Sequence, residues 1–174
     1  MNNKVKIKNL VLSGLFLSLA LVLPFLTGQI HGIGNMLCPM HIPVLLCGFF
    51  CGPWYGLIVG FIAPYLRFLL FGMPLLIPGA VGMSFELATY GIVAGALYRK
   101  FPKKKIYIYV SLLISMVVGR IAWGIARTVL FSLGKSEFGW KMFLTEGFVK
   151  AIPGIILQLM LIPILVITLK KAEQ

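Results

Sequence analysis

The sequence predicts an all-α integral membrane protein, a bundle of six transmembrane helices with both termini in the cytoplasm. Of its 174 residues, 60% are hydrophobic and only 11% are charged, and the mean hydropathy is +1.00. Soluble domains carry about 25% charged residues. The apolar residues gather in long runs close to the roughly 20 residues that a helix needs to cross a bilayer. No polar stretch is long enough for a second core, so residues 1–174 are expected to form one membrane domain.

The first three apolar runs cover 10–26, 41–51 and 54–71. The first follows a basic start and ends near Pro24. Because no small-residue cleavage site follows it, we interpret it as a retained helix and not as a secretory signal. The second is short, with Pro39 and Pro43 where a helix would begin. The third contains Pro64, which removes a helical hydrogen bond and predicts a kink.

The next three runs cover 79–97, 106–133 and 152–169. Three connections are then predicted to face outward. The first, 27–40, is rich in glycine and is either a loop that folds over a cavity or a plain connector. The second, FGMPLLIPG, has two prolines and two glycines, which predict a stiff turn. The third contains Trp140 and Phe143, whose rings favour the membrane interface.

The formal charge of +12 does not indicate nucleic-acid binding, because most of the basic residues flank the apolar runs on one side. Ten of the sixteen basic residues lie on that side: Lys4, Lys6, Lys8, Arg99, Lys100, Lys103, Lys104, Lys105, Lys170 and Lys171. Positive residues beside spans stay in the cytoplasm. This distribution predicts that both termini are cytoplasmic and that the chain is a multi-pass protein of the plasma membrane.

Four charged residues interrupt the apolar runs: Arg67, Glu86, Arg120 and Arg127. A charge at membrane depth is costly and normally faces a bundle interior or a watery cavity. With a rise of about 1.5 Å per residue, all four fall in the outer half of the bilayer. One carboxylate cannot neutralise three guanidinium groups, so the surplus positive charge favours an anionic ligand. Guanidinium binds carboxylate or phosphate through two parallel hydrogen bonds. The alternative is a structural Arg–Glu pair.

Other side chains are predicted to complete this polar site. Arg120 and Arg127 are seven residues apart and share a helix face, with Trp123 between them. Tyr90 lies four residues after Glu86 and shares its face. His41 begins the second run at the same depth, where it either donates to a ligand or caps and pairs locally. Gln158 either forms a hydrogen bond with a ligand or bonds a neighbouring helix. Asn35 in the 27–40 loop is a further candidate for the site.

Hydrolytic catalysis would lack its usual groups in this chain. There is no H-E-x-x-H motif, no G-x-S-x-G motif, and there are only two histidines and four carboxylates. Cys38, Cys47 and Cys51 have no second metal-ligand pair nearby, so we interpret them as small core residues. We therefore predict no enzyme activity, no metal and no cofactor. The absence of a P-loop also excludes ATP hydrolysis by that route.

The stretch CPMHIPVLLCGFFCGPWYGLIVGFIAPYLRFLLFGMP, followed by MSFELATYGIVAGALYRK, resembles the substrate-binding S component of energy-coupling-factor vitamin transporters. The resemblance covers about residues 10–169. It implies a six-helix subunit that captures a vitamin from outside and then associates with a transmembrane coupling protein and two cytoplasmic ATPases. The nickel and cobalt branch begins with Met-His, which the start Met1-Asn2-Asn3 lacks.

Within this family the chain is most similar to the pantothenate-type branch. Pantothenate carries a carboxylate, hydroxyls and an amide, which suit a site with surplus arginine. Folate, a queuosine precursor and pyridoxine remain open as substrates, and a membrane scaffold without a ligand remains open as a function. A self-sufficient transporter often shows inverted repeats, which this chain lacks.

The resemblance also implies a contact with the coupling subunit. The family usually carries A-x-x-x-A on the first helix for that contact. This chain has Gly14 and Ser18 at the same spacing. Small residues four apart let helices approach closely in lipid, so we expect Gly14 and Ser18 to contact the coupling subunit.

Overall fold

Every element of the described chain is helical, in agreement with the all-α prediction. The computed structural model describes residues 3–28, 38–102, 104–133, 143–149 and 151–172. Its α-helices are α1 (Asn3–Gly28), α2 (His41–Cys51), α3 (Pro53–Phe71), α4 (Val81–Lys100), α5 (Lys105–Leu133) and α7 (Ile152–Ala172). Two short π-helical turns, η2 (Leu76–Ala80) and η3 (Thr145–Val149), precede α4 and α7.

Five of these helices are long and apolar enough to cross a membrane, and α2 is the exception. The 11 residues of α2 span only about 16 Å at 1.5 Å per residue, roughly half a bilayer core. Its side chains are nearly all buried inside the bundle. All six predicted runs form helices, but the structure gives five candidate spans and one short internal helix. The expectation of six full spans is therefore not confirmed.

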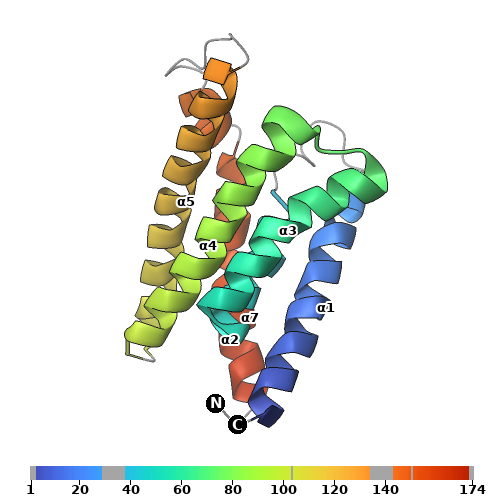
Figure 1. Ribbon diagram of the computed structural model, residues 1–174. Helices are drawn as coiled ribbons and strands as arrows, with labels where there is room; N and C mark the ends of the chain where they lie inside the picture. Colours follow the sequence, from blue (N-terminus) through green and yellow to red (C-terminus); the bar gives the residue numbers. More distant parts are fainter. Residues whose placement is uncertain (1–2, 29–37, 103, 134–142, 150, 173–174) are drawn as a thin grey trace.

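Helix α4 lies at the centre of the bundle. Figure 1 shows α5, α4, α3 and α1 side by side, with α2 and α7 behind this row. Glycines permit the close approach of α3 to α4, because a Cβ atom on Gly91 would fall on the backbone carbonyl of Gly56. Gly60 likewise lies against the backbone of Leu87. In lipid, such van der Waals contact between backbones replaces the hydrophobic drive for helix association.

Both termini lie at the same end of the bundle, together with the connection between α4 and α5 (Figure 1). This end carries nine of the ten flanking basic residues, and the tenth, Lys103, lies outside the described residues. The charge rule predicts that this end faces the cytoplasm. We call it the basic end. The opposite end, where α1 and α3 finish and α2 and α4 begin, is called the outer end.

Several helices extend beyond the predicted apolar runs. Helix α1 begins at Asn3 and continues through Pro24 to Gly28, and α4 continues to Lys100. Lysine side chains can keep their apolar stems along the helix while the charged ends reach water, so a membrane helix can continue into turns that carry lysines. An internal proline is tolerated in a membrane helix because neighbouring groups satisfy the freed carbonyl. Helix α3 also continues through the buried Pro64.

The outward connection between α3 and α4 is described in full. Gly72 ends α3 in the left-handed conformation, with φ of +70°, a backbone geometry that favours glycine. The chain then turns through η2 into α4. Most of the other two outward connections, including Trp140, lies outside the described residues.

Candidate functional site

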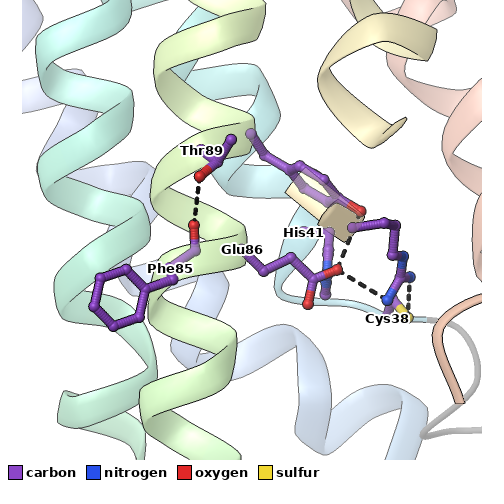
Figure 2. A network of polar contacts seen from close by, with 7 residues as sticks. Cys38, His41, Phe85, Glu86 and Thr89 are labelled. Atoms are coloured by element: carbon purple, nitrogen blue, oxygen red, sulfur yellow. Dashed lines mark hydrogen bonds and ion pairs between the residues drawn. The ribbon is translucent and has the colours of Figure 1, made fainter. Parts of the chain in front are cut away.

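A buried ionic cluster lies where α2, α4 and α5 meet, and Glu86 of α4 is its centre (Figure 2). Its Oε1 atom is 2.9 Å from an Arg120 guanidinium nitrogen and 3.2 Å from Nε2 of His41. The hydroxyl of Tyr90 donates a hydrogen bond of 3.1 Å to the same oxygen. The structure therefore brings together Glu86, Arg120 and His41, which the sequence placed at one depth, and Tyr90, which it placed on the helix face of Glu86.

The cluster is almost sealed from its surroundings. Glu86 is 2% exposed, His41 3% and Arg120 6%. Gly119 allows Tyr90 to lie against α5, because a Cβ atom there would fall on the Tyr90 ring. At such burial a lone charge would be expensive, and opposite charges at contact distance offset that cost. The structural Arg–Glu pair left open by the sequence is thus present.

His41 connects this cluster to a cavity of about 300 Å³ at the outer end of the bundle. The cavity is lined by Pro24, Cys38, Pro39, Met40, His41, Arg67, Met73, Pro74 and Met83. It lies above the first turn of α2, since α2 is too short to fill the outer half of the bundle. The Nδ1 atom of His41 is buried and has no hydrogen-bond partner among the described residues. His41 therefore faces both the ionic cluster and the cavity.

Arg67 of α3 lies at the cavity and apart from the Glu86 cluster. One of its guanidinium nitrogens donates a 3.2 Å hydrogen bond to the carbonyl of Leu21 in α1. The guanidinium carbon lies 5.3 Å from the centroid of the Phe25 ring, within cation–π range. These contacts hold the side chain against the end of α1. The predicted layer of charges is thus divided between the cluster and the cavity wall.

Arg127 and Trp123 form a third group, further along α5. The Arg127 guanidinium lies 5.0 Å from the Trp123 ring centroid and 5.6 Å from that of Phe131. Trp123 is buried and its ring centroid lies 6.1 Å from that of Phe143. The side chain of Arg127 also covers Gly82 at the start of α4. Neither Arg127 nor Trp123 belongs to the lining of the outer-end cavity.

Gln158 and Asn35 complete the predicted set. Gln158 of α7 is 1% exposed, and neither polar atom of its amide has a hydrogen-bond partner among the described residues. A buried polar group without a partner is uncommon in folded proteins and points to water or a ligand. Asn35 lies outside the described residues.

Sequence reasoning missed part of the cavity wall. Met40, Met73 and Met83 line it together with Pro24 near the end of α1, Pro39 before α2 and Pro74 after α3. Methionine is an adaptable apolar residue that fits irregular ligands. The prolines of the two outward connections were the available signal, because they mark where the chain turns over the outer end.

Gly14 and Ser18 lie on an exposed face of α1, at the edge of the bundle (Figure 1). A Cβ atom added at Gly14 would meet nothing within 4 Å. The Ser18 hydroxyl donates to the carbonyl of Gly14 at 3.0 Å, so its polar group is satisfied within the helix. This face is open to a further membrane helix.

Among the described residues, no group of three or more His, Cys, Asp or Glu side chains is arranged to hold a metal ion.

Comparison with known proteins gives one match. The family model for the substrate-specific component of ECF transporters matches residues 8–166. No curated protein and no solved structure matches the chain. The family match covers nearly the whole bundle, including the Glu86 cluster and the outer-end cavity. The chain therefore belongs to the family of substrate-specific components of ECF transporters.

Proposed function

We propose that this component captures a small anionic vitamin, with pantothenate as the best candidate, in the cavity at the outer end of the bundle. Substrate-specific components of ECF transporters bind a small substrate and work with a membrane coupling subunit and ATPases. They are transport subunits and not a class of enzymes. Uptake from outside is then powered by two cytoplasmic partner ATPases, in the plasma membrane.

One observation carries the proposal: the outer-end cavity is lined by an arginine and a histidine in an otherwise largely apolar wall. Its volume of about 300 Å³ lies at the lower end of the range for small-molecule sites, about 300–1,000 Å³. The wall residues Met40, Met73 and Met83 suit the aliphatic part of a ligand. Arg67 suits its carboxylate, because an arginine fork matches that group.

The charge balance of the helices supports an anionic ligand. The six helices contain Arg67, Arg120 and Arg127 at membrane depth but a single carboxylate, Glu86. Glu86 is in contact with Arg120, so it lies away from the cavity arginine. The first turn of α2 also points its positive dipole end at the cavity.

We assign separate roles to the predicted site residues. Arg67 and His41 contact the ligand directly. His41 is held in place by the ionic cluster of Glu86, Arg120 and Tyr90. The amide of Gln158 does not line the cavity, but it has no hydrogen-bond partner among the described residues, and we assign it to a polar group of the ligand.

The remaining predicted residues extend this proposal. We also assign to the substrate site Trp123 and Arg127, which do not line the outer-end cavity, and Asn35, which lies outside the described residues. Gly14 and Ser18 form the contact with the coupling subunit, on the exposed face of α1.

Calorimetric binding to the purified chain tests the proposal. Pantothenate is compared with the corresponding alcohol, which lacks only the carboxylate, and wild-type protein is compared with Arg67→Gln. We expect wild type to prefer the acid by roughly tenfold or more, since a charge-assisted hydrogen bond contributes about 1.5–3 kcal/mol. Arg67→Gln should bind both ligands equally.

Lys100→Gln is the matched control, because it removes one positive charge at the basic end of α4. This variant should keep the preference for the acid. An undiminished preference in Arg67→Gln would contradict the role of Arg67, and no binding of any vitamin would favour the scaffold alternative.

A further inference from the structure

A second cavity lies at the basic end of the bundle, between the ends of α4, α5 and α7. Its volume is about 620 Å³. Its lining consists of Tyr98, Lys105, Ile108, Val166, Ile167, Lys170 and Lys171. None of these residues belongs to α1, α2 or α3, so the cavity is separate from the substrate site and from the small-residue face of α1.

The rim of this cavity is strongly positive. Three of its seven lining residues are lysines, and none is acidic. Lys105 begins α5, whereas Lys170 and Lys171 lie in the last turn of α7. The Lys170 ammonium lies 4.2 Å from the centroid of the Tyr98 ring, which is a cation–π contact. Tyr98 is buried and therefore fixes one of the three cations at the rim.

The floor of the cavity is apolar and buried. Ile108 is 5% exposed and Val166 is 0% exposed. Beside the cavity, Ile106 and Tyr109 of α5 and Leu169 of α7 are exposed on the surface of the bundle. Both helices therefore carry exposed apolar side chains close in sequence to the residues that line the cavity.

The lysines lie at the boundary of the membrane. The candidate spans of α5 and α7 are Lys105–Ser132 and Ile152–Lys171, so the three lysines stand where the apolar segments begin or end. Ends of spanning segments lie at the level of the lipid headgroups. Clustered lysines beside membrane helices attract anionic lipids, and basic pockets between such helices bind phosphate headgroups.

We propose that this cavity binds the phosphate headgroup of an anionic phospholipid. The phosphate lies among Lys105, Lys170 and Lys171, the glycerol backbone rests on the half-buried Ile167, and the acyl chains follow the exposed apolar side chains of α5 and α7. A lipid explains both halves of the site, because a soluble phosphate would leave the apolar floor without a function. The proposal is independent of the transported substrate.

The test measures lipid binding to delipidated protein in detergent by native mass spectrometry. The ligands are phosphatidylglycerol and phosphatidylcholine with identical acyl chains, and glycerol phosphate as the soluble headgroup. We expect phosphatidylglycerol to bind at least roughly tenfold more tightly than phosphatidylcholine. The triple variant Lys105→Gln, Lys170→Gln, Lys171→Gln should reduce that preference to less than about threefold.

The matched control is Lys4→Gln, Lys6→Gln, Lys8→Gln, which removes the same charge from α1 and should keep the full preference. The double variant Lys105→Gln, Lys171→Gln alters only exposed side chains and should lose most of the preference even if the triple variant folds poorly. An equal loss in the α1 variant, or an unchanged preference in the double variant, would overturn the proposal. Glycerol phosphate binding as tightly as the lipid would show that free phosphate is the ligand and would also overturn it.

Discussion

The Glu86 cluster predicts a large and asymmetric response to mutation. In Glu86→Gln, the guanidinium of Arg120 loses a partner at 2.9 Å while it stays only 6% exposed. Breaking a buried ion pair from one side typically costs about 3–5 kcal/mol, because the remaining charge is uncompensated. For a chain of this size, each kcal/mol corresponds to about 2–4 °C in the unfolding midpoint. We therefore expect the midpoint to fall by roughly 6–20 °C in detergent.

The double variant Glu86→Gln, Arg120→Met removes both charges and should be more stable than Glu86→Gln alone. Tyr90→Phe is a milder control, because it removes only one hydrogen bond and should cost about 1 kcal/mol. The measurement is a thermal unfolding scan of all four proteins without ligand. The midpoints of Glu86→Gln and Tyr90→Phe could fall by the same small amount, or the fall in the double variant could equal the sum of the falls in the two single variants. Either result would show that the ion pair does not stabilise the bundle.

Three further predictions concern packing, ligand and partner. Gly91→Ala should destabilise the bundle by at least about 2 kcal/mol in a thermal unfolding scan, because its Cβ would meet the backbone of Gly56. The control Gly14→Ala meets no atom and should be neutral or stabilising by up to about 1 kcal/mol. Gln158→Leu should keep or raise the stability of the ligand-free protein and weaken vitamin binding in calorimetry; unchanged affinity would remove Gln158 from the site. Gly14→Leu should keep vitamin binding but reduce co-purification with the coupling subunit and ATPases, and full co-purification would place that contact elsewhere.

The helices could be predicted from the sequence because five of the six apolar runs have the length and hydropathy of a membrane segment. The depth of the charged residues followed from the same runs, since the helical rise is fixed. This was sufficient to predict that Glu86, Arg120 and His41 lie at one level, and the four-residue spacing predicted that Tyr90 shares the helix face of Glu86. Their contacts in the structure agree with that prediction.

The sideways position of each residue could not be predicted in the same way. Depth along a helix does not determine how the helix is rotated or which neighbour it meets. Arg67 contacts Leu21 and Phe25 of α1 and lines the cavity, apart from Glu86. Its position depends on how α3 packs between α1 and α4, and that packing is set by the glycine contacts.

The short helix α2 also shaped the site in a way that the sequence only partly indicated. Its 11 residues and flanking prolines were visible in the sequence. The consequence, a cavity above its first turn, depends on how far the other helices extend past it.

A structure determined with bound pantothenate tests the central claim most directly. The account predicts that the carboxylate lies within about 3 Å of the Arg67 guanidinium, with the ligand between the first turn of α2 and the end of α3. A ligand bound elsewhere in the bundle, with Arg67 still bonded only to Leu21, would contradict it.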